Sequence, residues 1–144
     1  MSRSGNSIAS HEATVALVEG NERLRAALGT SITERGYELV NVSNSQQALA
    51  TVASAQITLV DLLLDDMDGL SLIEEIRARH RNMHIIAVLP DRVARDQLDM
   101  EDAAIVQMAS QSGANAVFIA PFNLGELLTT IDRFEDAART INAA

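Results

Sequence analysis

The stretch that most constrains the fold is the run ITLVDLLLDDMDG at Ile57–Gly69, where a short apolar segment ends on one carboxylate, Asp61. Branched apolar residues over so short a length, bounded by polar ones, are typical of a strand buried on both faces, as in the centre of a parallel sheet. In open α/β sheets, ligands bind beyond the carboxyl ends of the strands, where the loops diverge and leave a crevice. Asp61 is therefore a candidate site residue.

Other apolar segments alternate with helical patterns along the chain. The expected strands are residues 13–18, 38–42, 57–61, 83–89 and 116–119. Apolar residues at helical spacing predict a helix after each strand; the fourth begins near Asp99, after an added loop at 91–98. Parallel neighbours need right-handed crossovers, so the pattern predicts an α/β fold. We expect a doubly wound five-stranded parallel sheet, in the order 2-1-3-4-5, with five helices.

The composition favours one compact domain. The chain has 144 residues, 47% of them apolar and none of them Cys, so a core can form while disulfides and thiolate metal sites are excluded. We expect a flexible tail at 1–11, one domain at 12–136 and an extension of the last helix at 137–144. No apolar segment has the length of a membrane span or the form of a signal peptide, so we expect a cytoplasmic protein.

The charge argues against nucleic acid as a ligand. The net charge is −9 and the pI about 4.6, so the field of the protein repels polyanions. All eleven basic residues are arginines, and the chain contains no lysine at all.

A second acid, Glu19, follows the first expected strand. In the order 2-1-3-4-5 the first and third strands are neighbours, so Glu19 and Asp61 converge. Two adjacent carboxylates repel each other unless a raised pKa, a hydrogen-bond donor or a hard cation such as Mg²⁺ intervenes. The backbone carbonyl of Leu63 can add a third oxygen ligand. The alternative for Glu19 is a solvated acid in a turn.

Three segments resemble the receiver domain of two-component response regulators. They are LVEGNERLRAAL at 17–28, DLLLDDMDGLSLIEEIR at 61–77 and GANAVFIAPFNLGELL at 113–128. The resemblance covers residues 13–134 in the right order and spacing. It implies the flavodoxin-like receiver fold and a place in phosphorelay signalling.

The resemblance also implies roles for individual residues. Asp61 occupies the position of the phosphoacceptor aspartate. Glu19, Asp61 and the backbone carbonyl of Leu63 become the ligands of a weakly bound Mg²⁺ ion. The peptide bond between Ala120 and Pro121 is expected to be cis, a state that proline allows.

Four positions depart from the family pattern. Gly20 stands where the family has a second acid, and Leu89 where it has a hydroxyl residue at the end of the fourth strand. Ala120 replaces the lysine of the fifth strand, and the absence of lysine means that no realignment restores it. The aromatic switch position falls on Val117, with Phe118 beside it.

These departures favour an atypical, stand-alone receiver that works by contact with a histidine kinase or another signalling protein, with impaired or absent phosphorylation switching. The alternative is a conventional receiver that takes phosphate from a histidine kinase onto Asp61 with Mg²⁺. We expect no enzymatic activity beyond self-phosphorylation at Asp61. A hydrolase that used Asp61 as its nucleophile would need a general acid two residues later, where Leu63 stands. A homodimer through the last helix is a further expectation, because Ile141 continues its apolar stripe.

Overall fold

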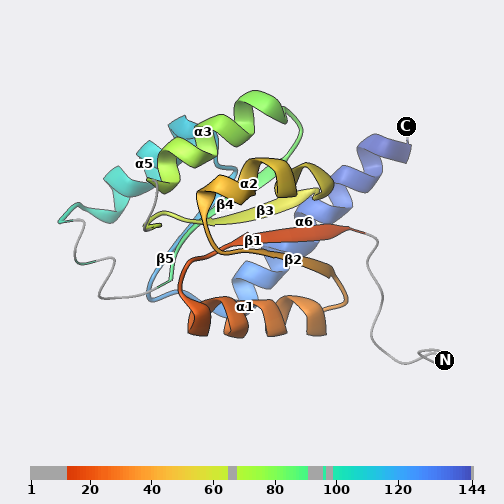
Figure 1. The fold of residues 1–144 in the computed structure, drawn as a ribbon, viewed down its shortest axis with the longest axis horizontal. Helices are drawn as coiled ribbons and strands as arrows, with labels where there is room; N and C mark the ends of the chain where they lie inside the picture. Colours follow the sequence, from red (N-terminus) through yellow and green to blue (C-terminus); the bar gives the residue numbers. More distant parts are fainter. Residues whose placement is uncertain (1–12, 65–67, 91–95, 97–98, 144) are drawn as a thin grey trace.

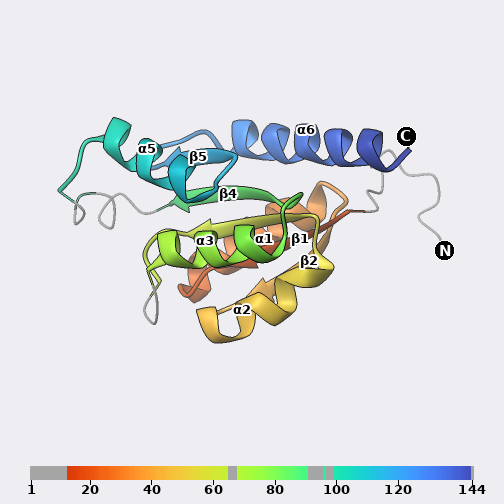
Figure 2. The same ribbon diagram turned by 90° about the horizontal axis from the view of Figure 1, so that it is seen from above.

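The computed structural model describes residues 13–64, 68–90, 96 and 99–143, with side chains up to Arg139. Helices cover both faces of a central sheet: Figure 1 draws α3 and α5 along its upper side and α1 along its lower side, and Figure 2 turns the same view. The expected tail at 1–11 and nearly all of the expected loop at 91–98 lie outside the described residues. The domain boundaries at 12 and 136 stay a prediction.

The strands form one parallel sheet in the order β2-β1-β3-β4-β5, which confirms the predicted order. Their bounds are β1 (Thr14–Val18), β2 (Glu38–Val42), β3 (Ile57–Asp61), β4 (His84–Leu89) and β5 (Ala116–Ile119). β3 is buried along its whole length because it lies in the centre of the sheet and is covered on both faces. The apolar run of the sequence thus occupies the position that its composition predicts.

Five α-helices connect and follow the strands in the described part of the chain, the number expected. Their bounds are α1 (Glu22–Glu34), α2 (Ser45–Thr51, followed by a 3-10 turn η1 at Val52–Ser54), α3 (Gly69–Arg79), α5 (Asp102–Ser112) and α6 (Leu124–Ala143). Asn44 and Asp68 cap α2 and α3 with their side chains, as their positions in the sequence predict. None of these helices combines the length and the apolar character that crossing a bilayer requires.

The expected start of α5 near Asp99 is wrong by three residues. Asp99 has a φ of 49°, in the left-handed region, and a right-handed helix cannot pass through that conformation. Glu101 instead occupies the N-cap position, and the helix begins at Asp102. Backbone conformation, which the apolar spacing does not report, sets this boundary.

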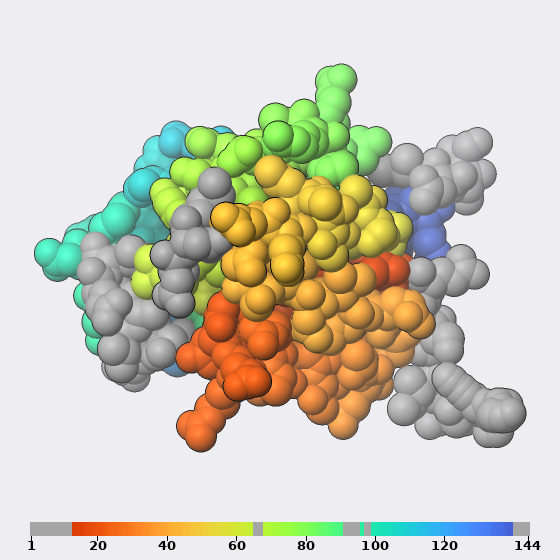
Figure 3. Space-filling view, viewed as in Figure 1, coloured from red at the N-terminus to blue at the C-terminus, as the bar shows by residue number. Residues whose placement is uncertain are grey.

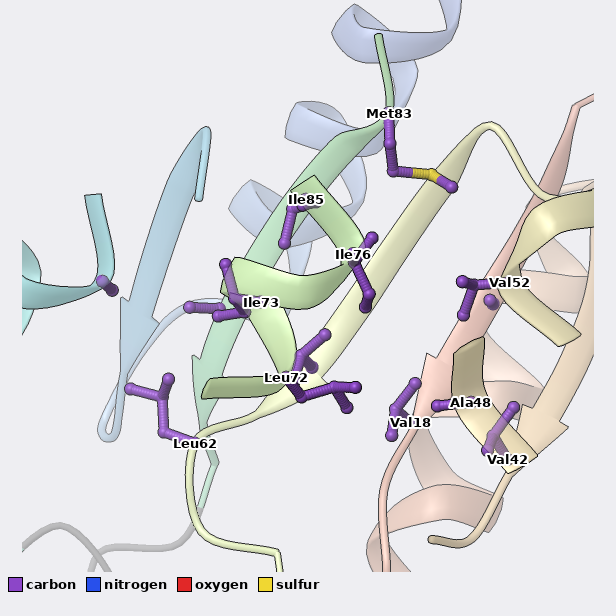
Figure 4. Close-up of a cluster of buried hydrophobic side chains, with 14 of the residues drawn as sticks. Val18, Val42, Ala48, Val52, Leu62, Leu72, Ile73, Ile76, Met83 and Ile85 are labelled. Carbon is purple, nitrogen blue, oxygen red and sulfur yellow. The ribbon is translucent and has the colours of Figure 1, made fainter. Parts of the chain in front are cut away.

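The sheet separates two hydrophobic clusters. One lies under α2, α3 and α5, and Figure 4 shows Leu72, Ile73 and Ile76 of α3 within it. The other lies under α1 and α6, where Leu127 and Ile131 of α6 are fully buried. Each buried Leu or Ile side chain contributes about 1.5–3 kcal/mol of transfer free energy. These clusters hold the strand ends, and therefore the site, in fixed positions.

The first residue of α3 must be small because the helix begins against the end of β3. A Cβ atom on Gly69 would lie 2.6 Å from the Cα of Leu62 and closer still to the carbonyl oxygen of Asp61. The amide of Gly69 donates to the carbonyl of Leu62 over 3.2 Å. Glycine therefore permits the close approach that fixes the backbone around Asp61.

Candidate functional site

The register of the sheet places Glu19 and Asp61 side by side at its carboxyl edge. The last matched pair of β1 and β3 is Val18 with Val60, and the two acids follow directly. The backbone amide of Glu19 donates to the carbonyl of Val42 on β2 over 3.0 Å, which extends the ladder to the acid. Glu19 and Asp61 are only 2% and 8% exposed. The alternative of a solvated turn acid is therefore wrong for Glu19.

The two carboxyl groups are in hydrogen-bond contact. Burial, followed by the hydrogen bond to Asp61 and the negative charge of Asp61, raises the pKa of Glu19 to about 8. The amide of Asn21 and the charge of Arg25 oppose this rise. The raised pKa favours the protonated form of Glu19 at neutral pH.

Backbone amides and one arginine hold the acids in place. The amide of Asn21 donates to Oε2 of Glu19 over 3.1 Å, and the amide of Leu63 donates to Oδ1 of Asp61 over 2.8 Å. Arg25 on α1 donates from its Nη1 to the carbonyl oxygen of Glu19 over 2.9 Å. The two amides orient the carboxyl groups, and the Arg25 contact holds the backbone of Glu19.

The chemistry of these donors fits a hard cation. Carboxylate and carbonyl oxygens are the ligands that Mg²⁺ prefers, and Glu19 and Asp61 bring two carboxyl groups to this edge, with the backbone of Leu63 next to Asp61. The charge count is low, because Gly20 brings no carboxylate although its nearest neighbour, the carbonyl oxygen of Ser43, leaves a Cβ an ordinary 3.4 Å. Within the described residues no group of three or more His, Cys, Asp or Glu can hold a metal ion. The residues present fit one weakly held Mg²⁺ ion.

The other half of the carboxyl edge, where β4 and β5 end, is apolar. Leu89 is fully buried in the cluster under α3 and α5, and Ala120 is 6% exposed. The amide of Ala120 donates to the carbonyl of Leu89 over 2.8 Å, so the two residues are adjacent. The bond from Ala120 to Pro121 is cis, as the resemblance implies. Neither residue offers a side-chain donor to an anion bound at Asp61.

The two residues at the expected aromatic switch position point to opposite sides of the sheet. Val117 packs against the cluster under α2, α3 and α5, whereas Phe118 packs against the cluster under α1 and α6. Phe118 also meets the ring of Phe122 edge to face, with ring centres 5.7 Å apart. The neighbouring aromatic ring therefore cannot take the place of Val117, because successive strand residues face opposite ways.

Sequence reasoning did not single out Asn21 and Arg25, although both contact Glu19. Asn21 also caps α1, since its side chain accepts a hydrogen bond from the amide of Leu24 over 3.0 Å. Residues four apart lie on the same side of a helix, so the spacing of Asn21 and Arg25 was an available signal.

Comparison with known proteins gives the site a family context. A family model described as the response regulator receiver domain matches residues 15–132. The chain is 26% identical over 115 residues to a cyclic di-GMP phosphodiesterase of Thermotoga maritima, which covers 80% of this chain and 28% of that protein. It is 29% identical over 131 residues to the transcriptional regulatory protein KdpE of Staphylococcus aureus, covering 90% of this chain and 52% of KdpE. The chain thus spans about half the length of KdpE and a smaller share, 28%, of the length of the phosphodiesterase.

A shorter relative matches over nearly its whole length. The sporulation initiation phosphotransferase F of Bacillus subtilis is 23% identical over 122 residues, which cover 83% of this chain and 91% of that protein. Among solved structures, a CheY-like receiver domain protein from Methanospirillum hungatei superposes with a TM-score of 0.72 at 19% identity. That match covers 92% of this chain and 98% of the other, and it supports the fold.

Proposed function

Because the chain belongs to the response regulator receiver family of two-component signalling, we propose that it is an atypical receiver that signals by contact with a protein partner. Its phosphorylation switch is impaired or absent. The observation that carries this proposal is the apolar half of the carboxyl edge, where Leu89 and Ala120 are buried and hydrogen-bonded through their backbones alone. Asp61 keeps the position of the phosphoacceptor, but nothing on β4 or β5 is built to grip a phosphoryl group there.

The energetic consequence is large. An aspartyl phosphate would bring about −1.5 to −2 charges, by analogy with other phosphorylated residues. Each charge-assisted hydrogen bond contributes about 1.5–3 kcal/mol, so the absence of a hydroxyl at Leu89 and an ammonium at Ala120 weakens the hold by several kcal/mol. A switch needs contacts that differ between its two states, and Leu89 can form no hydrogen bond to phosphate.

Mg²⁺ binding at Glu19, Asp61 and the Leu63 carbonyl is weak in this proposal. The acid pair holds a proton at neutral pH, so the cation must first displace it. Gly20 stands where the family pattern has a second acid, so one carboxylate ligand is missing. The site therefore binds Mg²⁺ appreciably only at the upper end of the physiological pH range.

The proposed docking surface consists of α5, β5 and the start of α6. Three large apolar side chains are exposed there: Val106 and Met108 on α5, each 41% exposed, and Leu124 on α6, 39% exposed. Because residues two apart on a helix point in different directions, Val106 and Met108 offer apolar contacts to a partner on two sides of α5. We propose a histidine kinase or another cytoplasmic signalling protein as the partner, with no direct contact to nucleic acid or membrane.

The test is phosphorylation by acetyl phosphate with Mg²⁺, followed by intact mass spectrometry. We expect little or no added phosphate on the wild-type chain. A double variant, Leu89→Thr with Ala120→Lys, restores both donors and gains the added mass, and Asp61→Asn in that background loses it again. Full modification of the wild-type chain at Asp61, with shifted amide resonances in α5, β5 and α6, would establish the conventional receiver instead.

A homodimer through α6 is a second partner hypothesis. The helix runs to Ala143 and so continues through the region where the sequence predicts an extension. The side chain of Ile141, on which the apolar stripe depends, lies outside the described side chains. Light scattering of the full chain and of a chain without residues 140–144 tests this hypothesis. The same oligomeric state in both argues against a dimer through α6.

A further inference from the structure

The end of the sheet opposite Asp61 carries an unusual concentration of positive charge. The sequence RARHRNMH at 77–84, from the end of α3 to the start of β4, contains three arginines and two histidines but no acid, in a chain of net charge −9. Figure 1 places this connection at the amino ends of the strands, on the side towards which the last turns of α6 extend. The family role of Asp61 does not account for this feature.

Arg77 contributes a charge that no described carboxylate balances. Its guanidinium donates to the carbonyl oxygens of Gly113, His80 and Arg81, over 2.8 to 3.2 Å, and to Oδ1 of Asn115 over 2.8 Å. All of these acceptors are neutral oxygens. Burial lowers the pKa of Arg77 from its ordinary value but leaves it charged at neutral pH. The charge of Arg77 is therefore not balanced by an ion pair among the described residues, whereas Arg79 pairs with Glu75 over 3.4 Å.

The same hydrogen bonds fix the backbone that displays the neighbouring side chains. Because Arg77 binds the carbonyls of His80 and Arg81, the connection is held from inside. Arg81 and Asn82 are exposed, and no hydrogen bond or ion pair engages their side chains in the described part of the chain. The fixed backbone lowers the entropy cost of binding, and the side chains of Arg81 and Asn82 are available to contact a ligand.

His84 adds a buried nitrogen without a hydrogen-bond partner. Its ring stacks on Phe134 of α6, with ring centres 4.7 Å apart and planes 19° from parallel. Nδ1 is buried and unpaired among the described residues. Burial, and secondarily the charge of Arg77, lowers the pKa of His84, so the ring is neutral at neutral pH and carries one N–H donor. An unpaired buried polar atom costs free energy unless a ligand or water satisfies it.

These groups surround a hollow of about 340 Å³ between the α3–β4 connection and α6. Its lining includes Gln56, His80, Arg81, Asn82, His84 and Ala138, and none of the described residues that line it is acidic. A second hollow of about 330 Å³ shares Arg81, Asn82 and His84 and adds Arg77. Figure 3 shows the blue atoms of α6 at the right-hand edge beside the yellow atoms around the start of β3. A volume near 300 Å³ suits a small metabolite rather than a macromolecule.

We propose that this hollow is a binding site for a small organic oxyanion, a phosphate ester or a carboxylate, gripped by Arg81 and Asn82 with His84 at its base. Arg77 acts from below by supplying unbalanced positive charge. The apolar part of the ligand packs on Ala138 of α6. The site lies at the opposite end of the sheet from Asp61, so it does not depend on the proposed function.

The test is a titration of the full chain, without Mg²⁺ and at constant ionic strength, with sodium phosphate and sodium citrate as probes against sodium chloride. The ring resonances of His84 and the amides of residues 80–84 report the site by NMR. We expect saturable shifts there with at least one probe. Saturation by phosphate alone assigns a phosphate ester, and saturation by citrate alone assigns a carboxylate.

Matched variants separate a built site from diffuse charge. Arg81→Ala is expected to weaken binding about tenfold, which corresponds to about 1.4 kcal/mol. Arg79→Ala removes the same charge two residues earlier in the chain. Arg79 pairs with Glu75 and does not line the hollow, so the affinity for the probe should change less than about twofold. Asp61→Asn should leave the affinity unchanged, which separates this site from the carboxyl edge.

Two outcomes would overturn the inference. One is the absence of saturable His84 shifts with both probes in the wild-type chain. The other is equal weakening by Arg79→Ala and Arg81→Ala, which would leave only the general field of the basic segment. Both variants alter exposed side chains, and circular dichroism verifies that they fold.

Discussion

The two halves of the carboxyl edge are built from the same kind of buried parallel strand, but they end in different chemistry. Glu19 directly follows β1 and Asp61 ends β3; backbone amides hold both carboxyl groups, and burial beside Asp61 raises the pKa of Glu19. Leu89 ends β4 and Ala120 directly follows β5, and these two residues only pack and hydrogen-bond through the backbone. One half of the edge can therefore still bind charge, whereas the other contributes to the core.

This difference shows that the fold and the chemistry of its edge are separable. Strand pairing needs only backbone groups and apolar faces, so a hydroxyl or an ammonium at the end of β4 or β5 can be lost without loss of the sheet. The loss does change what each half contributes to stability. The acid half costs free energy because two carboxyl groups are buried together, whereas Leu89 stabilises the folded state.

The largest effect is expected from Leu89→Ala. Truncating a fully buried leucine removes its transfer free energy and leaves a cavity, so the free energy of unfolding should fall by about 2–5 kcal/mol. Urea unfolding followed by circular dichroism measures it. Asp61→Asn, at the end of the neighbouring strand, serves as the contrast and should not destabilise. A loss as small in Leu89→Ala as in Asp61→Asn would show that the two halves do not differ.

The next effect is the pH dependence of stability that Glu19 causes. Its pKa is raised from about 4.5 to about 8 in the folded state, so the native protein holds a proton that the unfolded chain has released between these values. The free energy of unfolding should therefore fall as the pH rises from about 5 to about 8, by an amount on the order of a few kcal/mol. Because the pKa is raised on folding, the stabilising contribution of Glu19 is fully present only when the pH lies below the pKa of Glu19 in the unfolded chain, about 4.5.

Glu19→Gln provides the control for this pH dependence. The variant carries no titrating group at this position, so its stability should vary less over the same range. His84 has a lowered pKa and works in the opposite sense, since its contribution is lost as the pH falls. The difference between wild type and variant isolates Glu19, and parallel curves would contradict the raised pKa.

Mg²⁺ affinity should depend on pH for the same reason. If the cation must displace one proton from the acid pair, its apparent affinity rises about tenfold per pH unit until the pH reaches the pKa of Glu19, about 8. Isothermal titration calorimetry in two buffers of different ionisation enthalpy counts the released protons. Binding without proton release would show that the metal avoids the acid half.

The smallest effect is expected from Arg25→Ala. The charge of Arg25 opposes the rise of the Glu19 pKa and is the weakest of the influences on it, so its removal should raise that pKa slightly further. NMR titration of the Glu19 carboxyl carbon measures the shift. Arg23→Ala, which alters the same helix without contacting Glu19, should leave the titration unchanged.

Much of the fold follows from local pattern. The bounds of β2 and β5 match the expected residues 38–42 and 116–119, because alternating turn signals and apolar runs are properties of neighbouring residues. The start of α5 could not be read in this way, because the left-handed conformation at Asp99 leaves no mark on the apolar spacing. The site was predicted in its members Glu19 and Asp61, whereas Arg25 was not singled out although its spacing from Asn21 is visible in the sequence.

The sequence by itself determined which chemical groups exist at the carboxyl edge: two acids, a glycine, a leucine and an alanine, in a chain without lysine. Only the tertiary structure decided that burial beside Asp61 raises the pKa of Glu19, and that Arg81, His84 and Ala138 of α6 line one hollow. The reason is physical. The identity of a side chain is local, whereas its pKa, its burial and the space around it depend on groups that folding brings together from distant positions.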